Sequence, residues 1–301
     1  MSVTAAQGFR AAGVRAGLKA SGKPDLALVV NDGPLDTAAG VFTTNRVVAA
    51  PVVWSRRLLA GQEGGQRGHA RAVVLNSGSA NACTGAQGMH DTEATAVRAA
   101  GLLGAEPDQV LVCSTGVIGQ RIDMPVLLEG VDVAALALAD TPQAGTDAAT
   151  AIMTTDTVSK EDALTVGAGE QSWTIGGMIK GVGMLAPGLA TMLAVITTDA
   201  VLTPQQAQDA LTSATTRTVN RINSDGCMST NDTVVLLASG ASGTTPSHDE
   251  LDEALTEVMS RLGRRLVADA EGATHDIAIT VSGAVSEEAA EAAARTVSSS
   301  N

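Results

Sequence analysis

The chain of 301 residues carries a formal net charge of −13, is 45% apolar and contains no tyrosine. Its length suits one large α/β domain or about two domains. Its acidity argues against binding to nucleic-acid phosphates, which requires clustered Lys and Arg side chains. No apolar stretch reaches the ~18 residues of a membrane span, so we expect no insertion into a membrane.

Hydrophobic patterning predicts strands that alternate with helices through both halves of the chain. The expected strands cover residues 26–31, 40–44, 47–54, 72–75, 109–113, 163–166, 172–175, 192–196, 233–238 and 276–281. The expected helices cover residues 90–103, 125–139, 148–153, 203–220, 247–266 and 286–297, and those near Thr203 and Ser247 begin with capping boxes. This alternation favours a layered α/β architecture.

The cysteines and histidines offer no metal site or disulfide framework. Cys83, Cys113 and Cys227 are odd in number and form no CxxC pair, and the four histidines lack the spacing of metal ligands. Unpaired cysteines favour a reducing compartment. Because the N-terminal sequence also lacks a secretory signal, we predict a cytoplasmic protein without a bound metal.

The first candidate for chemistry is Thr191. A segment rich in glycine and proline precedes it, which predicts a strained loop, and the apolar run 192–196 predicts a buried strand after it. Thr is an ordinary strand former at such a position. A hydroxyl fixed there could also act as a nucleophile if a base reaches it. No histidine lies in the polar loops, so the base must be another group. The simplest candidate is the α-amino group of Thr191, released by cleavage of the preceding bond.

Several polar loops follow predicted strand or helix ends, where a scaffold presents functional groups. The strand at 109–113 ends in Ser114, Thr115 and Gly116, where a backbone N–H can point into a cleft; an ordinary turn fits this sequence as well. Seven such segments occur in the order of a known family. They are 76–85 (NSGSANACTG), 113–119 (CSTGVIG), 151–157 (AIMTTDT), 180–185 (KGVGML), 190–199 (ATMLAVITTD), 229–233 (STNDT) and 269–274 (DAEGAT).

In these segments the chain resembles the bifunctional ornithine acetyltransferase / N-acetylglutamate synthase family of arginine biosynthesis, from about residue 8 to its end. The resemblance implies an α/β fold with layered α-β-β-α architecture and self-cleavage between Ala190 and Thr191. Cleavage would give an α chain, 1–190, and a β chain, 191–301, that assemble as an α2β2 heterotetramer. Thr191 would carry acetyl from N-acetylornithine to glutamate by a ping-pong route. Acetyl-CoA would be a second donor, and no other cofactor is implied.

The resemblance also implies roles for individual residues. The hydroxyl of Thr115 and the backbone N–H of Gly116 would form the oxyanion hole. The substrate-binding residues would be Thr154, Lys180, Thr191 and Glu271. Lys180 can pair with the α-carboxylate of an amino-acid substrate, and Glu271 can receive an ammonium group. The amino group of Thr191 would act first as general base and then as general acid.

The sequence departs from the family's pattern at three places. Ser79 stands where Asn is usual, and His275 where we expect Lys. The family's β chain continues well past the position of Asn301, so we expect a fragment or a shortened homologue that lacks one pocket wall. Two other interpretations stay open: an N-terminal-nucleophile amidohydrolase or aminopeptidase on a related fold, and an inactive truncated chain that only binds ligands.

Overall fold

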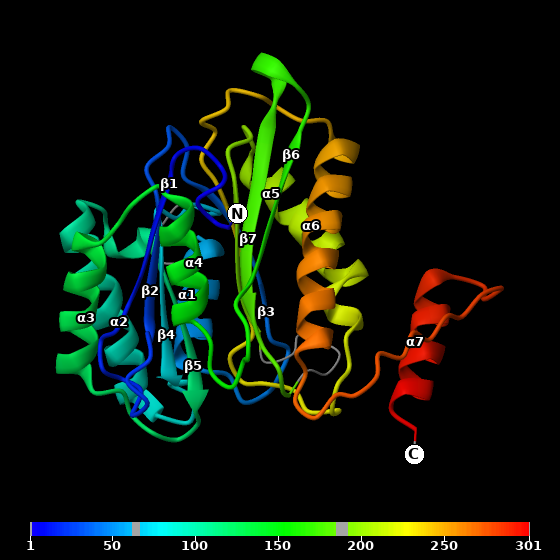
Figure 1. The fold of residues 1–301 in the computed structure, drawn as a ribbon, viewed down its shortest axis with the longest axis horizontal. Coiled ribbons are helices and arrows are strands. Elements are labelled where there is room, and N and C mark those ends of the chain that lie inside the picture. Colours follow the sequence, from blue (N-terminus) through cyan, green and yellow to red (C-terminus); the bar gives the residue numbers. More distant parts are fainter. Residues whose placement is uncertain (1, 62–66, 185–191, 301) are drawn as a thin grey trace.

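The computed structural model describes residues 2–61, 67–184 and 192–300 and shows two β-sheets packed face to face (Figure 1). The first sheet has the order β1 (Phe9–Val14), β2 (Leu26–Asn31), β4 (Ala72–Ser79), β5 (Val110–Val117). The second has the order β3 (Thr37–Phe42), β9 (Thr233–Ala238), β8 (Leu193–Thr198), β7 (Trp173–Lys180), β6 (Lys160–Val166). The pairs β4–β5 and β8–β9 are parallel, and all other pairs in these sheets are antiparallel.

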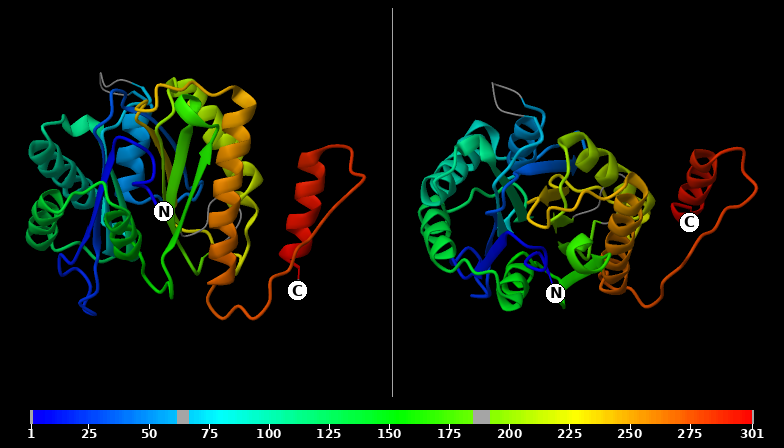
Figure 2. Two further views of the ribbon diagram at one scale, coloured as in Figure 1. Left: turned by 45° about the horizontal axis from the view of Figure 1, so that its top comes forward. Right: turned by 90° about the horizontal axis from the view of Figure 1, so that it is seen from above.

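Helices cover the outer faces of both sheets, which confirms the predicted α-β-β-α layers (Figure 2). The covering helices are α2 (Gly85–Leu103) and α3 (Met124–Leu136) on the first sheet, and α5 (Pro204–Arg217) and α6 (His248–Ala268) on the second. Helix α1 (Ala50–Leu59) packs against β5 and β3, and α4 (Pro142–Ala151) packs against β1 and β2. Helix α7 (Glu287–Ser298) stands apart and buries none of its residues.

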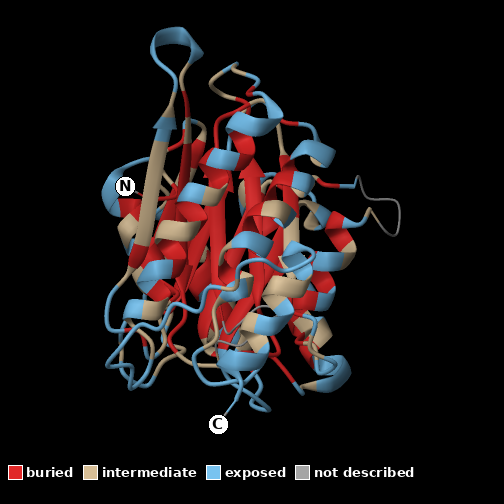
Figure 3. Ribbon diagram, turned by 90° about the vertical axis from the view of Figure 1, so that its right-hand side faces the viewer, coloured by how far each residue is buried: buried red, intermediate tan, exposed pale blue. Residues whose placement is uncertain are grey.

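Side chains of the second sheet alternate between two hydrophobic cores. Met178 and Leu193 pack in the core between the sheets, whereas Ile179 and Ala194 pack beneath α5 and α6. The central strands are buried on both faces, as Figure 3 shows in red. Because successive side chains of a strand point to opposite faces, Lys180 shares the face of Met178 and points toward the first sheet. The strand pattern thus brings a lysine between the sheets at the end of β7.

Two predicted strands are absent from the part of the chain that the structure describes. The strand expected at 47–54 is wrong, because α1 covers most of that range with Pro51 in its first turn, where a missing N–H costs nothing. Trp54 and Ser55 of α1 donate side-chain hydrogen bonds to carbonyl groups of β5. The strand expected at 276–281 is also wrong: these residues form no strand and are mostly exposed.

Other elements were predicted correctly in kind but not always in extent. Strands 26–31 and 233–238 match β2 and β9, and both predicted capping boxes, at Thr203 and Ser247, are present. Helix α2 begins five residues earlier than expected, at Gly85, and α4 begins at Pro142 rather than 148. Strand β5 continues through Thr115 and Gly116 to Val117.

Candidate active site

Thr115 and Gly116 lie where β4 and β5 end side by side. In this parallel pair Thr115 is opposite Ser77 and Gly116 is opposite Gly78. Gly116 has φ +130°, and a Cβ built on it would lie 2.3 Å from the carbonyl carbon of Gly78. Only glycine tolerates both this backbone conformation and this close approach. The end of β5 is therefore fixed by a contact between two glycines, with the backbone of Gly116 exposed beside the buried Thr115.

Lys180 reaches this strand end from the other sheet. Its Nζ donates a hydrogen bond of 3.3 Å to Oγ1 of Thr115, and the residue is only 2% exposed. Burial lowers the pKa of Lys180 to about 8, because removal from water disfavours the charged ammonium. The carboxylate of Asp156, 4.0 Å from Nζ, opposes that shift. An ammonium whose pKa lies near neutrality therefore stands beside the hydroxyl proposed for the oxyanion hole.

A cavity of about 170 Å³ opens next to Lys180. Its lining residues are Thr154, Thr155, Lys180, Val182, Gly183, Met184 and Glu271. Glu271, which follows α6, donates its backbone N–H to the carbonyl of Val182 at 2.7 Å. Its Oε2 would lie 3.2 Å from a Cβ at Gly183, so the carboxylate lies close against the segment that follows β7.

The charges around this cavity fit an amino acid better than an apolar ligand. Lys180 offers a cation for a carboxylate, and Glu271 offers an anion for an ammonium. A larger cavity of about 430 Å³ lies between α7 and the segment around Ile277, away from the strand ends. We assign the site to the smaller cavity, because Lys180 at the end of β7 lines it and is hydrogen-bonded to Thr115 at the end of β5.

The polar loop 229–233 contacts the same end of β5. The side-chain amide of Asn231 donates to the carbonyl oxygen of Ser114, and Oδ1 of Asp232 accepts the N–H of Met192 at 3.1 Å. Burial raises the pKa of Asp232 well above its usual value. Asp232 thus anchors the backbone at the residue that follows Thr191 in the sequence. Ala190 and Thr191 themselves lie outside the described residues.

Sequence reasoning missed a buried ion-pair network beneath the cavity. Nζ of Lys160 donates to Oδ1 of Asp156 at 2.7 Å and to Oδ2 of Asp269 at 2.5 Å. Asp156 and Asp269 belong to segments that carried the family resemblance, so a signal for them existed. Lys160 had none, because a single Lys just before a predicted strand suggests a solvent-exposed residue.

Of the sequence-predicted site residues, the structure brings together Thr115, Thr154, Lys180 and Glu271, with Gly116 adjacent; their roles stay predictions. In the described ranges 2–61, 67–184 and 192–300, no group of three or more His, Cys, Asp or Glu side chains could hold a metal ion. No helix within those same ranges is both long and apolar enough to cross a membrane.

Known proteins match the chain along its length. The model of the ArgJ family matches residues 10–301. The arginine biosynthesis bifunctional protein ArgJ of Bifidobacterium longum is 58% identical over all of this chain and 75% of its own length. The protein of the same name from Streptomyces coelicolor is 55% identical over all of this chain and 76% of its own length. The chain therefore spans about three quarters of the length of these relatives.

Solved structures show the same relationship. Ornithine acetyltransferase of Mycobacterium tuberculosis, complexed with ornithine, is 52% identical with a TM-score of 0.58, over 63% of this chain and 96% of that chain. ArgJ of Bacillus halodurans is 34% identical with a TM-score of 0.57, over 64% of this chain and 95% of that chain. A Burkholderia β-aminopeptidase, 13% identical with a TM-score of 0.53 over 89% of this chain and 86% of its own, shares the fold alone. The family match and these identities together show that the chain belongs to the ArgJ family.

Proposed function

We propose that this chain transfers the acetyl group of N-acetylornithine to glutamate through Thr191. Membership of the ArgJ family places it among the acetyltransferases of arginine biosynthesis. The observation that carries the proposed route is that Lys180 and Glu271 line one cavity and that Lys180 is hydrogen-bonded to Thr115. A carboxylate-binding cation, an oxyanion donor and an ammonium-binding anion are the groups that acetyl transfer between amino acids requires.

The proposed reaction begins with cleavage of the chain. Oγ of Thr191 attacks the carbonyl carbon of Ala190, the peptide C–N bond breaks, and an ester joins the two residues. Water then hydrolyses the ester, which leaves a carboxylate on Ala190 and a free amino group and hydroxyl on Thr191. The solved chains from M. tuberculosis and B. halodurans match 63% and 64% of this chain, about 190 residues. This length supports an α chain of 1–190 and a β chain that begins at Thr191.

Acetyl transfer follows at the new N-terminus. Oγ of Thr191 attacks the amide carbonyl of N-acetylornithine while its proton passes to the α-amino group. The amide C–N bond breaks, the proton moves to the departing amine, and ornithine leaves an acetyl ester on Thr191. The amine of glutamate then attacks this ester, Thr191 regains its proton, and N-acetylglutamate leaves. Thr115 and Gly116 would stabilise the oxyanion in both halves, at about 3 kcal/mol for each donor.

The cavity would bind the substrates through their charges. Lys180 would hold the α-carboxylate, and Glu271 would receive the side-chain ammonium of ornithine, the amino acid bound in the M. tuberculosis structure. Thr154, which also lines the cavity, would contribute a polar contact. With a pKa of about 8, Lys180 is still mostly charged at pH 7, and this supports its pairing with the carboxylate beside Thr115.

Three further properties belong to the same proposal. The relatives are named bifunctional, which supports a second reaction in which acetyl-CoA loads Thr191 and CoA leaves as the thiol. The two chains would assemble as an α2β2 heterotetramer. A cytoplasmic location is supported by Cys83, Cys113 and Cys227, which are all free thiols.

The test follows labelled acetyl from N-acetylornithine in the presence of glutamate. The proposal predicts labelled N-acetylglutamate with the natural chain and none with Thr191→Ala. Labelled free acetate, with glutamate left unmodified, would instead identify an amidohydrolase. Calorimetric binding of N-acetylornithine without any turnover would identify a ligand-binding chain, and either outcome would overturn the proposal.

A further inference from the structure

We propose that Asp156 and Lys160 are positioning residues of the acetyl-transfer site. Asp156 would hold Thr154 and Lys180 in place, and Lys160 would tie that carboxylate to Asp269 and so to the segment that carries Glu271. This inference rests on the proposed function, because it assigns to these residues the alignment of the two charges that bind substrate. Neither residue lines the cavity, so each would act through the residues that do.

Asp156 holds the backbone at or next to two residues that line the cavity, Thr154 and Lys180. Its Oδ1 accepts the backbone N–H of Gly181 at 2.8 Å, directly after Lys180, and its Oδ2 accepts the N–H of Thr154 at 3.0 Å. The same Oδ2 lies 4.0 Å from Nζ of Lys180. The residue is 6% exposed, so water competes little for these contacts. One buried carboxylate therefore sets the separation of two residues proposed to bind substrate.

Lys160 extends this arrangement to the third proposed binding residue. Its ammonium donates to Asp156, to Asp269 and, at 3.4 Å, to the carbonyl of Val158. Three acceptors use all three donors of an ammonium group, and the residue is 1% exposed. Lys160 therefore has no donor left for a substrate. Instead, Lys160 fixes the side chain of Asp269, which lies two residues before Glu271.

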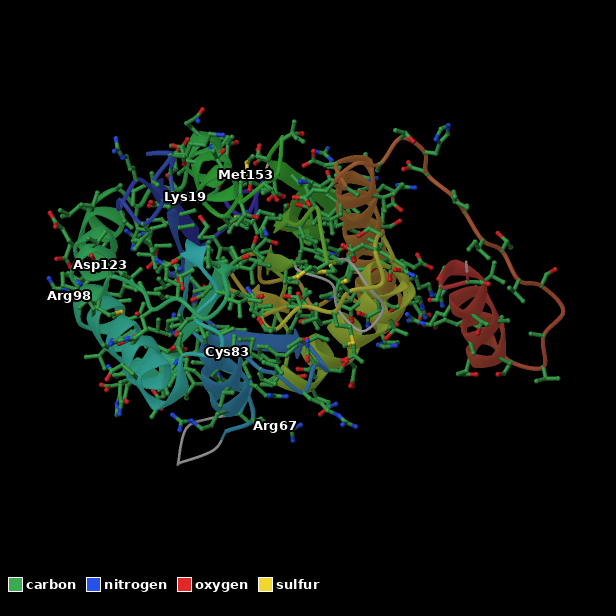
Figure 4. The ribbon with its side chains drawn as sticks, turned by 90° about the horizontal axis from the view of Figure 1, so that it is seen from below. Lys19, Arg67, Cys83, Arg98, Asp123 and Met153 are labelled. Atoms are coloured by element: carbon green, nitrogen blue, oxygen red, sulfur yellow. The ribbon has the colours of Figure 1, made fainter. Side chains whose placement is uncertain are left out.

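The segment before Thr154 is also held by the loop between β1 and β2. Nζ of Lys19 donates to the carbonyl of Met153 at 2.6 Å and to that of Pro24 at 2.8 Å. Lys19 and Met153 lie next to each other in the view with side chains (Figure 4). The lysines Lys19 and Lys160 thus bind the two ends of the segment 153–156. A turn of this kind forms without charged side chains.

The charges around Lys180 explain why the arrangement bears on function. The groups that act on its ammonium are Asp156 and Asp232, which favour the charge, and Lys160 and Lys19, which oppose it. A buried ion pair adds little net stability over an apolar replacement, but removal of one partner leaves the other charge buried and uncompensated. Loss of the Asp156 carboxylate would leave Lys180 facing two cations, with its main counterion gone.

Asp156→Asn tests the role of the carboxylate. We expect KM for N-acetylornithine to rise about tenfold or more, as loss of a charge-assisted contact predicts, with kcat within about threefold. We also expect the alkaline limb of kcat/KM to move to lower pH. Asp162→Asn is the matched control, because Asp162 lies on β6 but forms its ion pair with the half-exposed Arg261, away from the cavity lining. A folded Asp156→Asn protein with unchanged KM and pH profile would overturn the proposal.

A second readout does not depend on turnover. Trace acetylation of Lys180 by acetic anhydride across a pH series, read by peptide mass spectrometry, gives the titration midpoint of its amine. The midpoint should fall in Asp156→Asn and stay in place in Asp162→Asn. If the natural chain transfers no acetyl group, the proposed function is contradicted. If the titration midpoint of Lys180 does not move in Asp156→Asn, this inference is contradicted. If Asp156→Asn does not fold, Asp269→Asn replaces it: a raised KM supports the inference, and an unchanged KM overturns it.

Discussion

Lys180 on β7 and Thr115 on β5 meet in a hydrogen bond of 3.3 Å that crosses from one sheet to the other. The two sheets contact each other mainly through apolar side chains, so a buried ammonium at their shared edge is costly unless it has partners. Thr115 and Asp156 are those partners. The contact places the proposed carboxylate-binding group and the proposed oxyanion donor within one hydrogen bond of each other.

Replacement of Lys180 by Met should weaken substrate binding. Loss of a charge-assisted hydrogen bond costs about 1.5–3 kcal/mol, which corresponds to roughly 10–100-fold in KM. Steady-state kinetics with N-acetylornithine and with glutamate would measure the change. Lys23→Met is the control, because Lys23 is exposed and does not line the cavity. Equal KM values for the two variants would exclude Lys180 as a binding residue.

The depressed pKa of Lys180 predicts opposite pH trends for binding and stability. Its folded pKa lies at about 8 and its unfolded value at 10.5, so the unfolded chain binds more protons between these values. The contribution of Lys180 to the free energy of unfolding therefore rises across this window, while affinity for a carboxylate falls. Calorimetry with N-acetylglutamate, which has no titrating amine, should show weaker binding above about pH 8. The same titration with Lys180→Met should be flat, and a matching decline there would refute the assignment.

Gly116→Ala should damage both stability and turnover. The new Cβ would meet the carbonyl carbon of Gly78 at 2.3 Å, so the end of β5 must shift. Gly119→Ala is a close control: Gly119 also has positive φ, +83°, but a Cβ added there would meet nothing within 4 Å. We expect about 1 kcal/mol of destabilisation for Gly119→Ala and at least twice that for Gly116→Ala. Displacement of one oxyanion donor should also lower kcat about 100-fold or more. Similar unfolding free energies and kcat values for both variants would contradict the role of this close contact.

Asp232 should make the uncleaved chain less stable as pH rises. Burial raises its pKa well above the usual 3.8, so the folded chain holds a proton that the unfolded chain releases. Its stabilising contribution is complete below pH 3.8 and declines as pH rises toward the folded pKa. Asp232→Asn keeps an acceptor for Met192 and removes the titration.

Denaturant unfolding tests this in the Thr191→Ala background, which the proposal expects to remain one chain. The free energy of unfolding should fall less between about pH 5 and about pH 8 when Asp232 is replaced by Asn. Asp209→Asn, at an exposed carboxylate, should leave the pH dependence unchanged. If the free energy of unfolding has the same pH dependence in Asp232→Asn and in its parent, ionisation of Asp232 does not destabilise the folded chain.

The architecture could be predicted because the local sequence signals match the helices and strands that form its layers. The capping boxes at Thr203 and Ser247 and the apolar run of β9 each indicate the element that forms. The strand predicted at 47–54 was wrong. Its β-branched residues favour a strand, but the packing of Trp54 against β5 stabilises a helix. The apolar alternation at 276–281 predicted a half-buried strand, but no neighbouring strand pairs with it among the described residues.

The site could be predicted only where single segments carried a recognisable pattern. Thr115, Thr154, Lys180 and Glu271 lie in such segments, and the structure places them around one cavity or next to it. Lys160 could not be found, because its role depends on two acids, Asp156 and Asp269, the second of them 109 residues away in sequence. Spacing along a chain does not reveal such long-range ion pairs; the packing of α6 against β6 and β7 creates this one.

The most direct test of the account looks for the acetyl group on Thr191. Purified protein is incubated with N-acetylornithine alone, quenched in acid and mapped by mass spectrometry. The account predicts a peptide that begins at Thr191, carries one acetyl group on its hydroxyl, and loses that group when glutamate is added before the quench. A chain still joined at Ala190–Thr191 would contradict it. So would a free Thr191 that carries no acetyl after incubation with N-acetylornithine alone, if the same protein forms N-acetylglutamate once glutamate is added.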